Sequence, residues 1–497
     1  MTLFIKLMIF HKLQKTKTMK TINKNTVIKY LGIILISLFT GCKVPAWLQK
    51  TESKVVPSAY GDSKDTLNTA RIEWKTFFKD SNLVALIESA LNKNQELNIT
   101  LQEIYIAQNE VRTRKGAYLP FVGAGADAGI DKVGRYTSQG ANDANTQIMP
   151  GKEFPEPLPN YKIGLTASWE IDIWKKLRNS KKAALNRYFS SVEGKNFMVT
   201  KLISEIAKSY YELMALDNQL EFLNKNIEIQ QSALEIVKLE KMAARVTELA
   251  VRKFEAELFK NQSHQYYLMQ KITETENRIN FIVGRFPQQV KRNSKGFVNL
   301  IPDTIHAGIP SQLLANRPDI KQAEQSLLAA KLDIKVAKAE FYPSFRIKAG
   351  AGYQSFNPKY LIQTPQSLLF SLAGELVAPL INRNAIKAEF YSANSKQVQA
   401  VYNYERTILN AYLEVTNQIS NISNLEKSYE LKTKQVEALT QSIEISTGLF
   451  KSARADYMEV LLTQRDALES KFELIETKQQ QLNAMVSLYQ ALGGGWY

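Results

Sequence analysis

The chain has 497 residues, of which 44% are hydrophobic, and a formal net charge of +16. Seven lysines and no acidic residue lie within residues 1–41, so the remainder carries only +9, without a basic stripe interleaved with aromatic residues. This distribution argues against nucleic acid as a partner. The single cysteine, Cys42, excludes disulfides within the chain and any multi-cysteine metal cluster. The histidines are isolated, and the sequence has no phosphate-binding glycine loop or nucleophile elbow, so we expect neither an enzyme nor a cofactor or metal site.

The N-terminus is typical of a targeting segment. Lysines precede an apolar run over residues 30–39, which is too short to span a membrane and suits the core of a signal peptide. The run ends in Phe39-Thr40-Gly41-Cys42, which is similar to a bacterial lipobox, although that motif usually has leucine where Phe39 stands. We therefore predict a signal peptide over residues 1–41 and lipidation of Cys42, with a free buried thiol as the alternative.

A helix that changes into a strand is the first notable feature of the mature chain. Residues 42–81 are rich in polar residues and proline, and we expect a lipid-anchored extended segment there. A helix is predicted over 82–115 and a strand over 121–130, in which apolar residues alternate with glycine and aspartate. The period changes at Pro120, which cannot continue a helix. Residues 132–160, rich in Gly, Ser, Asn and Pro, are predicted to form an exposed loop.

The next segments predict a strand and a long helical hairpin. Residues 161–173 alternate strictly and carry aromatic residues at both ends, which is typical of a lipid-facing strand, although a sandwich strand would also alternate. A helix of about 70 residues then follows, whose apolar residues recur every seven positions as in a coiled coil. These residues are Ile206, Leu213, Leu220, Ile227 and Leu234. We predict a reversal over 242–247 and a return helix over 248–283, ended by Gly284.

The second half repeats this order after an irregular linker over 285–310. A helix up to residue 341 meets Pro343, and strands are predicted from there to residue 354 and over 368–380. A second long helix carries the heptad residues Ile408, Val415, Ile422, Tyr429, Val436, Ile443 and Phe450. A turn over 453–456 leads to a last helix over 457–492. The sequence therefore predicts two repeats, 82–284 and 311–492, and a tail over 493–497.

The lengths of these segments predict an oligomer. A helix of about 70 residues is about 105 Å long, and the two shorter helices of each half match it when stacked end to end. Four strands cannot close a membrane barrel, and an open sheet edge in lipid leaves unpaired amides. Three chains would supply twelve strands and enclose a solvent-filled interior. A dimer with eight strands is the alternative.

Several segments are similar to the TolC-like outer-membrane factors, particularly the lipoprotein branch that serves tripartite efflux systems of the resistance-nodulation-division type. They are Ala167-Ser168-Trp169-Glu170-Ile171-Asp172-Ile173-Trp174, Asn316-Arg317-Pro318-Asp319-Ile320, Ala337-Lys338-Ala339-Glu340-Phe341-Tyr342-Pro343 and Tyr489-Gln490-Ala491-Leu492-Gly493-Gly494-Gly495-Trp496. The resemblance implies a mainly α fold with a transmembrane β-barrel, in which an internally duplicated α-helical barrel joins four strands per chain. It further implies a homotrimer with a twelve-stranded barrel in the outer membrane of a Gram-negative bacterium and the helical barrel in the periplasm.

The implied function is that of a passive exit duct coupled to an inner-membrane pump through a periplasmic adaptor. In the family the periplasmic tip follows an Asp-Tyr pair, which is Asp456-Tyr457 here. Of the two acids three residues apart that TolC has, only Glu459 remains, because the second position is Leu462. We expect Glu459, with Asp456, to form an acidic ring at the gate, and Arg454, Tyr457 and Arg465 to latch neighbouring helices. Solvated turn charges are the alternative.

Two further expectations concern orientation and substrate. Arg346 and Lys348 should face a water-filled lumen, whereas Phe345 and Ile347 should face lipid. The sequence does not identify the substrate, because the scattered methionines are typical of core packing. Type I protein secretion and a lipid-anchored structural coiled coil of the envelope are the alternative functions.

Overall fold

The structure is a computed structural model that describes residues 44–46, 48, 50–61, 66–301, 305–381, 383–452 and 454–496. The predicted signal peptide and Cys42 lie outside the described residues. The chain divides into two compact units. One contains residues 118–176 and 335–392, and the other contains 48–117, 177–334 and the rest of the chain from 393.

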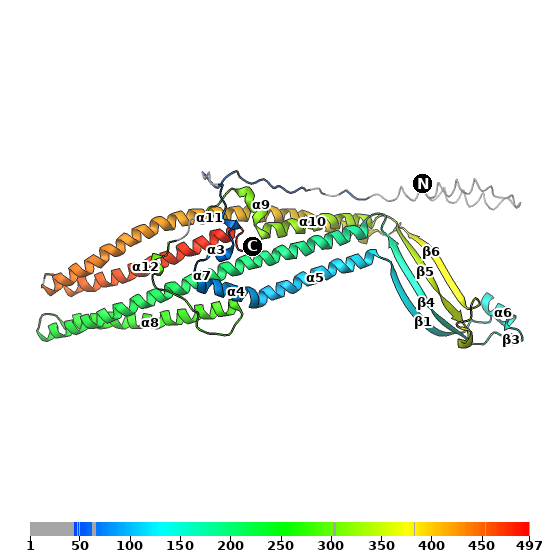
Figure 1. The fold of residues 1–497 in the computed structure, drawn as a ribbon, viewed down its shortest axis with the longest axis horizontal. Helices are drawn as coiled ribbons and strands as arrows, with labels where there is room; N and C mark the ends of the chain where they lie inside the picture. The colour runs from blue at the N-terminus through cyan, green and yellow to red at the C-terminus, as the bar shows by residue number, and fades with distance from the viewer. Residues whose placement is uncertain are drawn as a thin grey trace. The chain divides into compact units, whose positions relative to one another are not determined.

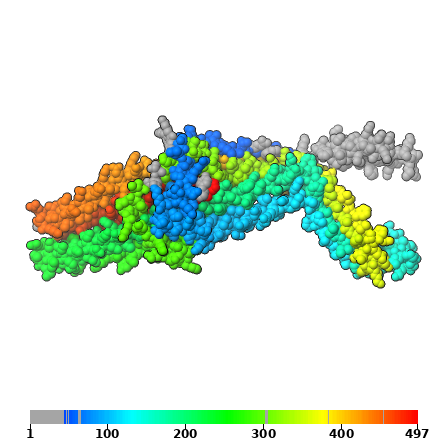
Figure 2. Space-filling view, in the orientation of Figure 1, coloured from blue at the N-terminus to red at the C-terminus, as the bar shows by residue number. Residues whose placement is uncertain are grey.

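The strand unit is built on one antiparallel sheet, with the order β1 (Phe121–Asp131), β4 (Leu158–Ile171), β5 (Ser344–Ser355) and β6 (Leu368–Val377). The four predicted strands are therefore confirmed, although β4 and β6 end before the predicted residues 173 and 380. Strands from the two halves of the chain meet where β4 pairs with β5 (Figure 1). β1 and β6 form the edges of this sheet, and β6 lies on the visible surface in Figure 2.

The prediction that 132–160 is a loop was wrong in detail. This segment contains helix α6 (Ser138–Ala144) and a small ribbon made by β2 (Gln147–Met149) and β3 (Lys152–Glu153). Thr137 caps α6 by accepting a hydrogen bond from the Gly140 amide at 3.1 Å, and Arg135 pairs with Glu156 at 3.0 Å. Polar contacts across some twenty residues thus order a segment that has no hydrophobic periodicity.

The second unit consists mainly of two long helical hairpins, α7 (Lys176–Met242) with α8 (Glu248–Val283), and α11 (Asn384–Lys451) with α12 (Tyr457–Ala491) (Figure 1). The predicted reversals and both return helices are confirmed. The shorter helices are α3 (Trp74–Phe77), α4 (Ser81–Lys93), α5 (Gln95–Tyr118), α9 (Leu313–Asn316) and α10 (Pro318–Ala339), and 3-10 turns cover Thr69–Arg71, Phe297–Asn299 and Pro310–Gln312. A further 3-10 turn, Pro358–Tyr360, belongs to the strand unit. None of the helices in the described residues is long and apolar enough to cross a membrane.

The prediction of one helix over 82–115 was wrong, because the helix is broken at Asn94. This residue has an extended backbone, with φ −62° and ψ 126°. Its side-chain oxygen accepts a hydrogen bond from the Leu97 amide at 2.8 Å and caps α5. Its side-chain nitrogen donates to the Ile282 carbonyl of α8 at 2.7 Å. A contact across 188 residues therefore fixes the break.

Four of the five predicted heptad residues of α7 are buried, whereas only three of the seven on α11 are buried and the other four are partly exposed. Ile206 and Leu213 of α7 are buried against Leu83 and Ile87 of α4. Nearer the reversal, the seam of α7 packs on α8 and α12 in a second cluster that includes Leu223, Ile227, Leu234, Val251, Phe254, Leu461 and Leu468. On α11 the seam residues Ile408 and Val415 are buried in a third cluster. Burial of these stripes supplies most of the stabilisation of such long helices.

Candidate functional site

The sheet has one polar and one apolar face. The register aligns Ala124, Leu165, Ala351 and Phe370 in one row, and Gly123, Thr166, Gly350 and Ser371 in the next. Because directly paired residues share a face and successive rows alternate, apolar rows alternate with rows in which glycine and polar residues predominate.

The apolar face packs on nothing within the described chain. Phe370 is 81% and Leu165 57% exposed, and Leu372, Leu376, Val122 and Ile130 are also exposed. Large contiguous apolar patches on a protein surface mark contact with a membrane or another protein. Here the patch follows the whole length of each strand.

The polar face carries a cluster of charges at one end of the strands. Arg346 and Glu170 are directly paired and lie 3.6 Å apart, and Lys348 forms an ion pair with Glu375 at 2.9 Å. Lys176 reaches the same Glu170 at 2.7 Å. The structure therefore places Arg346 and Lys348 on the face opposite to Phe345 and Ile347.

At both prolines where a helix changes into a strand, a tryptophan binds the backbone. The Trp174 ring stacks on Tyr342 at 4.7 Å, and its Nε1 donates to the Pro343 carbonyl at 2.7 Å. Close to Pro120, the Trp169 Nε1 donates to the Tyr118 carbonyl at 3.2 Å. The predicted helix up to residue 341 stops at Ala339, because the next amides bond in 3-10 fashion. The tryptophan contacts were not predicted from the sequence.

The predicted gate residues all lie at the turn between α11 and α12 or early in α12. Asp456 is the N-cap of α12 and Glu459 lies in its first turn. Both carboxylates are exposed, and so is Arg454. Tyr457 is partly buried against the cluster that α12 shares with α7 and α8. Arg465 pairs with its own neighbour Asp466 at 3.1 Å. The structure therefore brings Tyr457 to another hairpin, whereas the ion pair of Arg465 lies within its own helix.

The reversal between α7 and α8 differs from the turn between α11 and α12, because acidic side chains at the first reversal form ion pairs within the chain. Glu248 forms ion pairs with Lys241 and with Arg252, and Arg252 also pairs with Glu255 at 2.9 Å. The hydrogen bond from Lys241 holds the pKa of the Glu248 carboxyl below its usual value. Glu248 and Glu255 at the first reversal are therefore neutralised within the chain. The i, i+4 spacing of Glu248 and Arg252 could have predicted one of these pairs.

Within the part of the chain that the structure describes, no group of three His, Cys, Asp or Glu side chains could hold a metal ion. The chemistry available at the turns and on the sheet is thus electrostatic. Charged side chains on these surfaces can attract or repel ions, whereas the apolar face can contact lipid.

Comparisons with known proteins place these features in a family. The sequence profile of the family described as outer membrane efflux protein matches residues 86–285 and 309–494. The chain is 26% identical over 445 residues to the solvent efflux pump outer membrane protein SrpC of Pseudomonas putida, covering 88% of this chain and 91% of SrpC. It is 25% identical over 475 residues to the probable outer membrane lipoprotein SilC of Salmonella typhimurium, covering 94% and 99% of the two chains.

Among solved structures, the fold matches the open state of the MtrE outer membrane channel of Neisseria gonorrhoeae. The TM-score is 0.78 at 22% identity, and the match covers 91% of this chain and 99% of MtrE. The profile match extends over most of the sequence and includes both long hairpins and the four-stranded sheet. The chain belongs to the outer membrane efflux protein family.

Proposed function

We propose that this protein is the outer-membrane exit duct of a tripartite efflux system, which passes small molecules to the exterior without catalysis of its own. The observation that carries the proposal is the sheet with one lipid-compatible and one polar face, in a chain of this family. The partners are a periplasmic adaptor and an inner-membrane pump. The name of SrpC refers to solvent efflux, which favours small molecules over secreted proteins as cargo.

The duct is proposed to be a homotrimer. Within the described residues the outer edges of β1 and β6 have no strand partner, and an open edge is unfavourable in lipid. Pairing of β6 with β1 of the next copy would close twelve strands with three chains. The helical unit also supports association of several copies, because α11 exposes an apolar stripe along one side. The stripe consists of Tyr402, Leu409, Leu413, Leu431 and Ile445.

The domain organisation is proposed to follow the predicted repeats. Residues 82–284 and 311–492 form the two repeats, joined by the linker 285–310, and 493–497 form the tail. A lipid on Cys42, supported by the description of SilC as a probable lipoprotein, anchors the N-terminal segment 42–81 to the outer membrane after removal of residues 1–41. This segment is not extended throughout as predicted, because it contains the 3-10 turn Thr69–Arg71 and helix α3.

We place the periplasmic gate at the turn between α11 and α12. Asp456 and Glu459 are exposed there and make no ion pair within the described residues, unlike the acids of the first reversal. In a trimer these carboxylates would form an acidic ring that attracts cations. Arg454, Tyr457 and Arg465 would contact neighbouring helices, with Arg465 exchanging Asp466 for a partner across the interface.

The test is conductance of single channels in planar bilayers. Replacement of both Asp456 and Glu459 by alanine should reduce cation selectivity and weaken block by divalent cations. The matched control is Glu469→Ala, an exposed acid about 15 Å further along α12 at 1.5 Å per residue. Unchanged selectivity in the double variant would remove the acidic ring, and absence of any channel in the unmodified protein would remove the duct.

A further inference from the structure

In each half of the chain, the residue just before a shorter helix binds a carbonyl at the end of the return helix. We call this meeting point the joint: α5 meets α8 in the first half, and α10 meets α12 in the second half. Asn94 donates to the Ile282 carbonyl at 2.7 Å, and Arg317, which is 223 residues later, donates to the Ala491 carbonyl at 2.8 Å. Residues 282 and 491 are 209 apart, which is also the spacing of the heptad residues of α7 and α11. The glycines that end α8 and α12, Gly284 and Gly493, share this spacing and a positive φ. The joints are therefore structurally equivalent.

In the second half Arg317 fills the joint. Its guanidinium bonds both oxygens of Asp319, at 3.0 and 2.7 Å, and one oxygen of Glu414 at 2.6 Å. The side chain is only 5% exposed, and the neighbouring cavity measures about 260 Å³. Burial of this cation is thus compensated by two carboxylates and a carbonyl.

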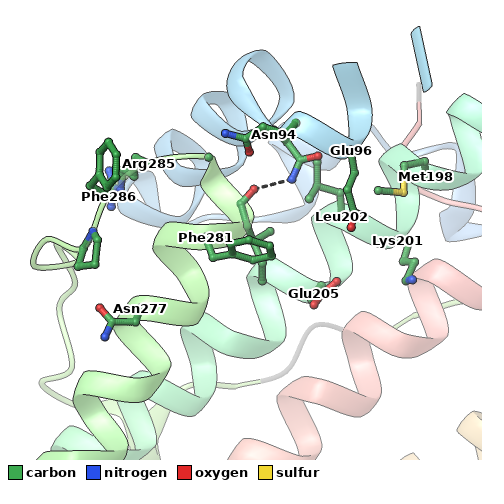
Figure 3. Close-up of a pocket in the computed structure, with 14 residues that line it drawn as sticks. Asn94, Glu96, Met198, Lys201, Leu202, Glu205, Asn277, Phe281, Arg285 and Phe286 are labelled. Carbon is green, nitrogen blue, oxygen red and sulfur yellow. Dashed lines mark hydrogen bonds between the residues drawn. The ribbon is translucent and has the colours of Figure 1, made fainter. Parts of the chain in front are cut away.

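The first half keeps both carboxylates but lacks the arginine. Glu96 stands 223 residues before Asp319, and Glu205 stands 209 before Glu414. Asn94, at the place of Arg317, is too short to reach them, and the cavity here is about 630 Å³. Figure 3 shows Asn94, Glu96 and Glu205 around this cavity. Neither glutamate forms an ion pair with another described residue.

Two basic residues also line the cavity, and neither takes the place of the missing arginine. The Arg285 Nε donates to the Asn280 oxygen at 2.6 Å, and Lys201, one helical turn before Glu205, forms no ion pair with it. Phe281 and Phe286 add exposed apolar surface to the rim. The cavity is thus suited to a long cationic side chain whose stem packs on apolar groups.

One wall of the cavity is also missing in a single chain. In the second half, α7 supplies this wall with Phe197, Thr200 and Lys208. Their equivalents 209 residues later are Arg406, Leu409 and Asn417 of α11, and all three are exposed. No residue of α11 lines the first-half cavity. Arg406 therefore lies on an exposed face of α11, at the position equivalent to Phe197 in the wall of the second-half cavity.

We propose that α11 of a second copy covers this cavity and that Arg406 of the partner subunit binds Glu205 and Glu96. The inference rests on the proposed trimer and adds to it a defined contact. The guanidinium comes from the same chain in the second half and from the neighbouring chain in the first half. Leu409 of the partner subunit then packs beside the exposed Phe281.

Cross-linking tests this contact in the full-length trimer. The double variant Glu205→Cys with Arg406→Cys, treated with a short bis-maleimide, should give covalent dimers and trimers on denaturing gels. Each single variant should give none, which controls for Cys42. A second control pairs Glu205→Cys with Lys434→Cys, which lies 28 residues further along α11, about 42 Å at 1.5 Å per residue.

Light scattering of the untreated protein separates the two levels of the proposal. A trimer that does not cross-link through positions 205 and 406 would overturn the contact and leave the trimer intact. A monomer would overturn both. Intersubunit products from the Lys434 control alone would place α11 elsewhere and also reject the contact.

Charge exchange tests the ion pair itself. Arg406→Glu and Glu205→Arg should each lower the temperature at which the detergent-solubilised trimer dissociates, and the double variant should recover most of the loss. Exchange of Glu430 and Lys434, an exposed ion pair within α11, should leave the temperature unchanged. Additive losses in the double variant of Arg406 and Glu205 would show that the two side chains do not meet.

Discussion

The clearest quantitative prediction concerns Leu165, which lies in the middle of the 14-residue strand β4 on the apolar face. Replacement by arginine would place a charge near the centre of the bilayer, at a cost of about 2–4 kcal/mol per chain. A closed trimer would bear this cost three times, about 6–12 kcal/mol in total, which is comparable with the whole stability of a typical domain, about 5–15 kcal/mol.

Thr166 provides a matched control on the opposite face. It is exposed and pairs with Gly123 and Gly350, so an arginine at this position finds water and no opposing side chain. After refolding into vesicles, the fraction of heat-modifiable trimer should fall at least about tenfold for Leu165→Arg, since 1.4 kcal/mol is a factor of ten, and little for Thr166→Arg. Equal assembly of both variants, or greater damage from Thr166→Arg, would refute the assignment of the faces.

Three further predictions concern the stability of the helical unit in urea. Arg317→Met leaves two carboxylates without their cation and should cost about 3–5 kcal/mol, whereas Arg317→Lys should cost less. Asn94→Ala removes the donor to the Ile282 carbonyl and should cost about 1–3 kcal/mol. Burial lowers the pKa of Lys478, so the folded state binds fewer protons than the unfolded state in the interval between this lowered pKa and the ordinary value of 10.5. The free energy of unfolding relative to that of Lys478→Met should therefore rise with pH through this range. A difference in free energy that falls with pH would contradict the lowered pKa of Lys478.

Local patterns predicted the strands and the reversals well. The change from a period of 3.6 to a period of 2 at Pro120 and Pro343 depends on the backbone chemistry of one residue and on its immediate neighbours. Seven-residue spacing likewise specified which face of α7 is buried, and the first turn of α12 begins at Tyr457 as predicted. These features depend on interactions within a few residues.

Features that depend on distant contacts were not predicted. The break at Asn94 has neither proline nor glycine to mark it, because its cause is a carbonyl 188 residues away. Arg317 could be noted as part of a motif, but its binding to Ala491 and Glu414 depends on the packing of α10, α11 and α12. Arg465 was assigned to a latch from its position, whereas a single chain pairs it with Asp466.

In each of the two units, one contact between the halves is made within the chain, and the equivalent contact lacks its partner among the described residues. In the sheet the joint between the halves, β4 with β5, is made within the chain, whereas the outer edges of β1 and β6 have no partner in the described residues. In the helical unit the joint that contains Arg317 receives α7 from the same chain, whereas the joint that contains Asn94 lacks the equivalent α11 wall. A duplicated chain that closes into a ring has one internal and one external joint per copy. An arginine retained at the internal joint and supplied by a neighbour at the external joint would let assembly of the ring provide the guanidinium that the first half lacks beside Glu205.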